Sequence, residues 1–167
     1  MELSRFQALD LVLVCGLPGS GKSHFARTHF QATDRLRVNR KEIRRLLYEM
    51  MSFGKTWTEQ EFSAGDDFLV KHVERKIIEH LLQNRSKLLI DNTSVSVSSR
   101  KSYVAIAQAM RKSIGVIFLD VPAIRCLEQN RLRADPVPEI VISNLAAGLN
   151  RPRPEEGFQE VLVLTAH

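Results

Sequence analysis

The chain has 167 residues, of which 24 are Lys or Arg and 19 are Asp or Glu, giving a formal net charge of +5. With 44% hydrophobic and 26% charged residues, the composition is that of a folded domain and excludes a disordered or collagen-like chain. A chain of this length buries roughly 68–70% of its unfolded surface, so we expect a single domain over residues 1–167. The longest apolar stretches, Leu11–Leu17 and Ile114–Leu119, are far shorter than the about 20 residues of a membrane span.

The cellular location is also predicted from composition. Cys15 and Cys126 show neither C-x-x-C spacing nor disulfide density, which favours a reducing compartment. The segment Met1–Asp10 contains two acidic residues and no apolar core, so we expect no signal peptide, a cytoplasmic protein and no membrane partner. The pI of 9.5 permits a polyanionic partner, although ordinary solvated surfaces carry the same charge.

Short apolar runs alternate with longer segments of helical period along the whole chain. This alternation is typical of a parallel sheet covered by helices on both faces. The sequence therefore predicts an α/β fold with five parallel strands. The predicted strands are Leu11–Cys15, Leu36–Asn39, Lys87–Asp91, Gly115–Asp120 and Glu160–Leu164.

Four helices are predicted between and after these strands, in addition to one that begins near Lys22. The segment Asp66–Gln83 has apolar residues spaced by four, at Leu69, Val73, Ile77 and Leu81, which predicts one buried helix face. The other three are a helix over Val97–Lys112 capped by Ser96 or a neighbouring serine, a helix that starts at Pro122 and runs to Asn130, and a short helix from Pro138 to Leu145 that ends at Gly148.

The least regular segment runs from Ser52 to Gly65 and contains three aromatic residues, Phe53, Trp57 and Phe62. Such residues could form a platform on which a base stacks. They could instead pin a loop onto the core, which is the more common use of isolated aromatics. The sequence favours the second interpretation.

The strongest motif is Gly16–Ser23, which matches G-x-x-x-x-G-K-S and directly follows an apolar strand. Its glycines allow backbone amides to turn inward as an anion nest, and the helix that follows directs its positive end at the phosphates. Lys22 is expected to reach the β- and γ-phosphates, and the Ser23 hydroxyl is expected to bind Mg²⁺. The predicted phosphate-binding residues are Gly16, Pro18, Gly19, Ser20, Gly21, Lys22 and Ser23.

This loop predicts a P-loop NTPase fold that binds ATP and Mg²⁺. A GTPase requires the base-specifying N-K-x-D motif, which the chain lacks, and a large motor ATPase requires a longer chain. A chain of this size with a mobile basic segment near residues 131–138 resembles a phosphotransferase of the nucleoside-monophosphate-kinase type. We therefore expect a short helical lid at this segment.

Further motifs, in order, resemble the kinase domain of 5′-polynucleotide kinases. The resemblance covers Leu11 to Leu164, and only the phosphate loop is specific by itself. The matching segments are Gly16–Ser23, Val38–Arg44, Leu89–Thr93, Arg100, Asp120–Pro122, Asn130–Arg133 and Glu156–Phe158.

The resemblance implies roles for individual residues. Arg44 would bind a phosphate on the acceptor side, Asp91 would orient the site, and Arg133 on the lid would close over the transferred group with Arg131 beside the donor nucleotide. A guanidinium offers a planar fork to phosphate oxygens, so these assignments are chemically sound. The alternative for Arg133 is a solvated helix end, and for Arg44 an ordinary member of a basic run.

One position departs from the family pattern. In the family's Asn-Arg-Asp-x-x-Arg motif the Asp is the general base, and here Lys41 stands in its place. Lowering a lysine pKa from about 10.4 to neutrality costs about 4 to 5 kcal/mol, and neighbouring phosphates oppose it, so Lys41 is not expected to be the base. Glu42 is a possible substitute, but it lies about 100° around a helix from that position, so the helix would have to start differently for Glu42 to take its place. Asp91 is the preferred surrogate or, equally, a carboxylate that only orients Mg²⁺ through water; Asp120 is a weaker candidate.

Three functions remain open from the sequence. The first is an ATP-dependent kinase whose acceptor is the 5′-hydroxyl end of DNA or RNA, with a positive channel for the acceptor. That channel would consist of Arg40, Lys41, Arg44, Arg45, Arg131, Arg133, Arg151 and Arg153. The second is a small-molecule kinase for a sugar, nucleoside or antibiotic, and the third is a nucleotide-binding module without transfer activity, for which Lys41 is the best support.

Overall fold

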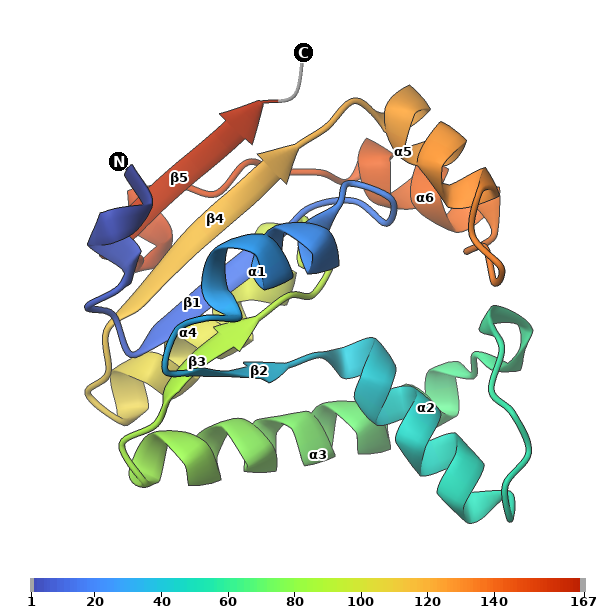
Figure 1. The fold of residues 1–167 in the computed structure, drawn as a ribbon, viewed down its shortest axis with the longest axis horizontal. Helices are drawn as coiled ribbons and strands as arrows, with labels where there is room; N and C mark the ends of the chain where they lie inside the picture. Colours follow the sequence, from blue (N-terminus) through green and yellow to red (C-terminus); the bar gives the residue numbers. More distant parts are fainter. Residues whose placement is uncertain (1, 166–167) are drawn as a thin grey trace.

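The computed structural model describes residues 2–165 and contains one sheet of five parallel strands (Figure 1). The order across the sheet is β2-β3-β1-β4-β5. The strands are β1 Leu11–Cys15, β2 Arg35–Val38, β3 Lys87–Ile90, β4 Ile114–Asp120 and β5 Glu160–Thr165. The predicted five-stranded parallel α/β fold is confirmed.

Six α-helices and three short 3₁₀ turns connect the strands. The helices are α1 Lys22–Phe30, α2 Arg40–Met51, α3 Ala64–Gln83, α4 Val97–Ala109, α5 Ala123–Arg131 and α6 Glu139–Ala147. The 3₁₀ turns are η1 Glu2–Phe6, η2 Glu59–Glu61 and η3 Pro154–Glu156. Within residues 2–165, no helix is long and apolar enough to cross a bilayer.

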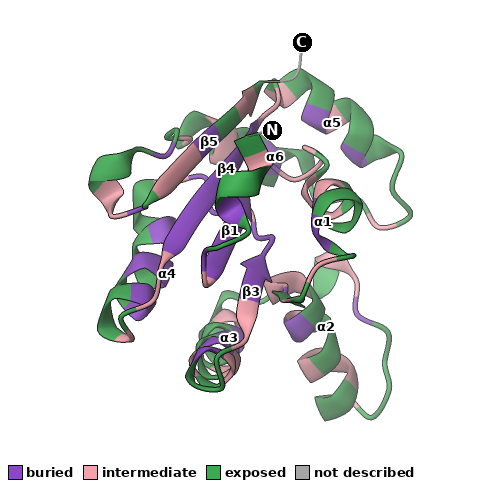
Figure 2. Ribbon diagram, turned by 60° about the vertical axis from the view of Figure 1, so that its left-hand side comes forward, coloured by how far each residue is buried: buried purple, intermediate pink, exposed green. Residues whose placement is uncertain are grey.

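Two apolar clusters cover the two faces of the sheet. On one face, alternate residues of β1 such as Leu11 and Leu13 pack with side chains of α3 and α4. On the other, Val12 and Val14 pack with side chains of α1 and η1, including Phe6. Because both faces are covered, the central strands read as continuous apolar runs, and Figure 2 shows them buried along most of their length.

Several boundaries differ from the predictions for local reasons. Asn39, predicted as the end of a strand, is instead the N-cap of α2, and its side chain accepts a hydrogen bond from the Glu42 amide at 3.0 Å. Ser96 caps α4 as predicted, in a reciprocal capping box with Ser99. Pro122 precedes α5 as its N-cap rather than occupying its first turn.

The buried face of α3 was predicted one residue out of place. Leu69 is 40% exposed, and the buried positions are Val70, Glu74, Ile78 and Leu82. Val73, Ile77 and Leu81 flank this face and are only partly buried. Both sets repeat every four residues, so periodicity alone does not choose between them.

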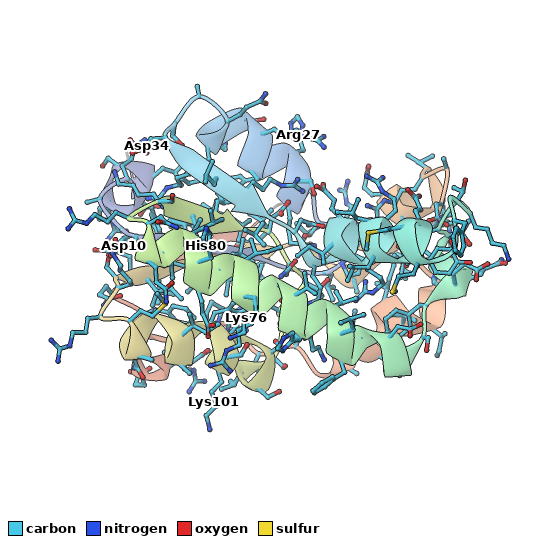
Figure 3. All side chains as sticks on the ribbon, turned by 90° about the horizontal axis from the view of Figure 1, so that it is seen from below. Asp10, Arg27, Asp34, Lys76, His80 and Lys101 are labelled. Atoms are coloured by element: carbon cyan, nitrogen blue, oxygen red, sulfur yellow. The ribbon has the colours of Figure 1, made fainter. Side chains whose placement is uncertain are left out.

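Parallel strands place all their carboxyl ends at one edge of the sheet. The phosphate loop follows β1, Asp91 follows β3, and α2 follows β2, so these segments gather at that edge (Figure 1). Asp10 and Asp34, which precede β1 and β2, lie at the opposite end of the molecule from α2 (Figure 3). Sites in open α/β sheets form at the carboxyl ends of the strands, which directs attention to the segments after β1, β2 and β3.

Candidate active site

The phosphate loop adopts a conformation that requires glycine at two close contacts. Gly19 has φ +85°, and a Cβ at this position would lie 2.3 Å from the Cys126 carbonyl oxygen in α5. Gly16 has φ +152°, and a Cβ there would lie 2.8 Å from the Leu119 carbonyl oxygen. Gly21, with φ +89°, has open space around it and serves as the N-cap of α1. The loop is therefore packed tightly between the ends of β4 and α5.

Several donors of this loop have no protein partner. Within residues 2–165, the backbone amides of Gly19, Gly21, Lys22 and Ser23 have no hydrogen-bond acceptor. The Ser20 hydroxyl oxygen is buried and also has no partner. A buried hydroxyl such as that of Ser20 normally has a partner, and a helix N-terminus with free amides attracts anions. The loop therefore fits the phosphate groups of a nucleotide.

The Lys22 side chain folds back onto the loop. Its Nζ donates hydrogen bonds to the carbonyl oxygens of Gly16 at 2.9 Å and Leu17 at 2.8 Å. Burial lowers the pKa of Lys22 to about 8; the charge of Asp91 opposes this lowering of the pKa, and that of Arg133 adds to it. The structure thus places Lys22 against the phosphate loop, and Asp91 at the end of β3, the strand next to β1.

Asp91 is held by two residues from the neighbouring edge of the sheet. Its carboxylate is buried and accepts hydrogen bonds from Arg37 at 2.9 Å and from the Asn39 side chain at 3.0 Å. Asn39 also donates to the Asp91 carbonyl oxygen at 2.9 Å. Both carboxylate oxygens therefore have donors, which fixes their orientation. No sequence motif predicted a role for Arg37.

A buried polar cluster beside Asp91 was not predicted. Glu74 on α3 is 2% exposed and accepts hydrogen bonds from Arg40, Asn92 and Tyr103 at 2.6–3.0 Å. The Arg40 amide also donates to the Asn92 side chain at 2.9 Å. This cluster joins the start of α2 to the end of β3. A charged residue in the same four-residue spacing as Val70 and Ile78 was the signal that could have revealed it.

The predicted acceptor side includes α2, where Lys41 and Arg44 are both in ion pairs. The Lys41 ammonium forms an ion pair with Glu59 and lies 5.5 Å from the centre of the Trp57 ring. Arg44 forms an ion pair with Asp67 at 2.6 Å, and its guanidinium lies 4.9 Å from the centre of the Phe62 ring. The Arg44 Nε is buried without a hydrogen-bond partner, so one donor of this residue is free.

The three aromatic residues of the 52–65 segment have different environments. Trp57 is 5% exposed, whereas Phe53 is fully exposed and Phe62 is half exposed. Trp57 therefore pins the loop onto the body of the domain, as the favoured interpretation predicted. A continuous platform of three rings is not formed.

Several of the cations expected to form a channel are neutralised by carboxylates. Arg131 pairs with Glu139 and Arg151 with Asp120, each at 2.6 Å; Arg40, Lys41 and Arg44 are also in ion pairs. Among the described residues, the members of the predicted channel without an ion pair are Arg45, Arg133 and Arg153. The field offered to an acceptor is therefore smaller than eight cations imply.

The predicted lid is the loop that joins α5 to α6, and we call residues 131–138 the lid loop. Its base is fixed by Asn130, which is 1% exposed and exchanges two hydrogen bonds with the Val137 backbone, at 2.7 and 3.0 Å. Arg133 lies beyond this base and is exposed. Figure 1 shows the lid loop (orange) facing the segment that follows α2 (blue-green).

Another ion pair with a buried member joins Arg100 to Glu156. Arg100 on α4 is fully buried and donates from two nitrogens to Glu156, at 2.8 and 2.7 Å. Its remaining nitrogen donates to the carbonyl oxygens of Ser94 and Asn150. Arg100 and Glu156, both in motifs of the family resemblance, therefore fasten the segment after β3 to the segment before β5.

The residues also fit a magnesium ion held jointly with a nucleotide. No group of three His, Cys, Asp or Glu side chains suited to a metal occurs in the described part of the chain. Mg²⁺ commonly uses one or two protein ligands together with substrate phosphates and water. The Ser23 hydroxyl at the start of α1, predicted as a ligand, is the kind of donor such a site uses.

Comparison with known proteins supports a kinase fold. A curated relative, the L-seryl-tRNA(Sec) kinase of Methanococcus maripaludis, is 23% identical over 85% of the chain. A chain of the Pnkp1/Rnl/Hen1 RNA repair complex is 25% identical over 83% of this chain, with a TM-score of 0.66. The chain spans about half the length of these two proteins, covering 53% and 43% of them.

A small-molecule enzyme is similar in structure as well. A sugar kinase from Janibacter sp. HTCC2649 has a TM-score of 0.67 and 16% identity, over 94% of this chain and 85% of that one. This likeness concerns the fold, which is that of the P-loop kinases. The model of the AAA_33 family, described as an AAA domain, matches residues 11–152. The chain belongs to this family of P-loop domains.

Proposed function

We propose that the protein is a kinase that transfers the γ-phosphate of ATP to a hydroxyl group, with the 5′-hydroxyl end of RNA or DNA as its acceptor. The observation that carries the proposal is the phosphate loop, in which four amides and the Ser20 hydroxyl lack protein partners. Lys22 belongs to this loop, Asp91 follows the neighbouring strand β3, and Arg133 lies in the lid loop after α5, the helix that contacts Gly19. Triphosphate binding and charge stabilisation are what phosphoryl transfer demands of a protein.

Each residue then has a defined task. The loop amides and Lys22 bind the β- and γ-phosphates, and Ser23 supplies a ligand to Mg²⁺, which neutralises charge on the phosphates when bound. Arg133 stabilises the charge that spreads over the transferred group. Asp91, with both oxygens held by Arg37 and Asn39, orients the site rather than removing the acceptor proton.

The missing general base does not prevent transfer. Phosphoryl transfer passes through a loose transition state in which little proton removal is required. General bases typically contribute about 10²–10⁴-fold to a rate. With Lys41 in an ion pair with Glu59, we expect slow turnover rather than none.

Two relatives support a nucleic acid acceptor. The names of the curated relative and of the similar solved complex refer to a tRNA and to RNA repair. Arg45, Arg133 and Arg153 carry no ion pair within residues 2–165 and remain available to phosphates of a strand. Binding through such contacts weakens steeply as salt concentration rises.

A small-molecule acceptor is the second candidate. It is favoured by the ion pairs that occupy Arg40, Lys41 and Arg44 on the acceptor side, because a polyanion needs free cations along its path. A metabolite would saturate the enzyme and show little dependence on salt. The fold shared with a sugar kinase is compatible with this function.

A transfer assay distinguishes these functions. The chain is incubated with ATP labelled at the γ-phosphate and Mg²⁺, together with 5′-hydroxyl RNA, 5′-hydroxyl DNA or a panel of sugars and nucleosides, and Lys22→Ala serves as the inactive control. We expect labelled 5′ ends whose yield falls steeply with added salt. If only a sugar or nucleoside is labelled, the acceptor is a small molecule and not a nucleic acid end. ATP binding without any product would leave a nucleotide-binding module.

A further inference from the structure

The lid loop and α2 are connected through one residue, Glu59. The Glu59 backbone amide donates to both carboxylate oxygens of Asp135 in the lid loop, at 3.2 and 3.1 Å. The Glu59 side chain forms an ion pair with Lys41 on α2. The Lys41–Glu59–Asp135 bridge therefore links segments 18 and 76 residues apart in the sequence.

The bridge has a firm support on each side. The Glu59 carboxylate is 12% exposed, and the Lys41 ammonium also contacts the ring of the buried Trp57. On the lid side, the hydrogen bonds between Asn130 and Val137 fix the base of the loop that carries Asp135. A partly buried charge pair next to an aromatic ring is stronger than an exposed one.

Arg133 is two residues from Asp135 in the same short loop. Fixing Asp135 therefore restricts where the Arg133 guanidinium lies. The lid loop directly follows α5, whose Cys126 carbonyl oxygen lies against Gly19 of the phosphate loop. Lys41 stands where the resembled family has its general base, yet it faces Glu59. Its position in the bridge provides a different use for this residue.

We propose that the Lys41–Glu59–Asp135 bridge is the closing contact of the lid loop, and that Lys41 and Glu59 are positioning residues that hold Arg133 over the phosphate loop. The role of Arg133 rests on the proposed function, whereas the contacts of the bridge are formed by the chain without any ligand. The replacement of a carboxylate by Lys41 creates an attraction to Glu59 where two carboxylates would repel. At this position, a side chain that would remove a proton is thus replaced by one that stabilises the closed lid loop.

Two measurements on the full chain without ligand test the bridge. The first is hydrogen exchange of the Glu59 amide by NMR. The second is acrylamide quenching of Trp57, which is the only tryptophan in the sequence. We expect Asp135→Ala to raise the exchange rate of the Glu59 amide at least tenfold and to increase quenching. Asp135→Asn, which retains an oxygen acceptor, should have an intermediate effect.

The Lys41 end of the bridge is tested by charge exchange. Lys41→Glu should raise the exchange rate of the Glu59 amide at least tenfold, and Lys41→Glu combined with Glu59→Lys should restore at least part of the protection of the residue 59 amide. Glu61→Gln is the matched control, because Glu61 lies in the same turn and bonds instead to the Tyr48 hydroxyl at 3.0 Å. It should leave exchange and quenching unchanged.

The outcomes separate the bridge from the proposed function. If Asp135→Ala and Lys41→Glu leave exchange of the Glu59 amide at the wild-type rate, the bridge is overturned, whether or not the chain is a kinase. If exchange responds as expected and an acceptor is phosphorylated, Asp135→Ala should lower kcat at least tenfold with less than a threefold change in ATP affinity. An equal loss of both, or no loss of kcat, would overturn the positioning of Arg133.

Discussion

Arg37 donates a hydrogen bond to Asp91 at 2.9 Å, so a cation on the edge strand β2 holds the buried carboxylate that follows β3. Arg37 also pairs with Glu42 at 2.7 Å. Asp91 and Glu42 are two of the three candidate surrogates for the missing base. A single guanidinium therefore restrains both.

The pair predicts that Asp91 and Arg37 act as a unit. Asp91→Asn should reduce transfer severely, by about 10²-fold or more, because the orientation of the site depends on a charged pair. Arg37→Met should leave Asp91 buried without its cation and cause a loss of similar size. The double variant should lose less than the product of the single losses when steady-state rates are compared; fully multiplicative losses would show that the two residues act independently.

The pKa of Lys22 predicts a link between nucleotide binding and protons. Burial lowers the pKa of Lys22 to about 8 in the ligand-free loop, and bound phosphates favour the charged form. ATP binding at pH 8 should therefore take up about half a proton. Calorimetry in two buffers of different ionisation enthalpy measures this uptake. Lys22→Arg keeps the charge at every pH and should abolish it.

The same lowered pKa predicts how stability varies with pH. Between about pH 8 and 10.5 the unfolded chain carries a proton on Lys22 that the folded chain has partly lost. The contribution of Lys22 to the free energy of unfolding therefore increases as the pH rises through this window. Urea unfolding of the wild type and Lys22→Arg isolates it: the wild type should gain stability relative to the variant. A constant difference would contradict the burial of the amine.

Arg133 is expected to act on turnover rather than on nucleotide binding. It is exposed and has no ion pair or side-chain hydrogen bond within residues 2–165, so Arg133→Ala should preserve folding. Since stabilising arginines contribute about 10³–10⁵ to the rate of phosphoryl transfer elsewhere, kcat should fall far more than ATP affinity. Arg153→Ala removes the same charge from another residue of the predicted channel and serves as the control. Equal losses in both variants would indicate a general electrostatic effect.

The Arg100–Glu156 pair is expected to contribute mainly to stability. Removing one partner of a buried ion pair typically costs about 3–5 kcal/mol, and Arg100→Met also leaves the Ser94 and Asn150 carbonyl oxygens without this donor. The midpoint of urea unfolding should fall accordingly. Replacing both Arg100 and Glu156 by Met should cost less than the sum of the single changes. An unchanged midpoint for Arg100→Met would rule out this contribution.

The part of the site that the sequence predicts is the part set by strand order. Apolar runs located β1 and β3, and in a parallel sheet their carboxyl ends bring the phosphate loop and Asp91 to one edge. The glycine spacing and the following helix predicted the loop itself, and the structure shows its free amides. Local rules of this kind need no knowledge of distant side chains.

The acceptor side depends on contacts that no local rule contains. The pKa of a lysine and the family motif concern position 41 alone. The partner of Lys41, Glu59, lies in an irregular segment whose path is set by burial of Trp57. Glu74 illustrates the same point, because its burial follows from packing that selects the Val70 face of α3 over the Leu69 face. Periodicity offered both faces equally.

The contact between Gly19 and Cys126 has a mechanical consequence. The carbonyl group of Cys126, in the helix that leads to the lid loop, occupies the space of a side chain at position 19. The phosphate loop and the helix that leads to the lid loop are thus in direct backbone contact, with no space for a side chain between them. A ligand that widened the turn at Gly19 would therefore displace α5. We expect the position of α5, and with it that of the lid loop, to depend directly on whether the phosphate loop is occupied.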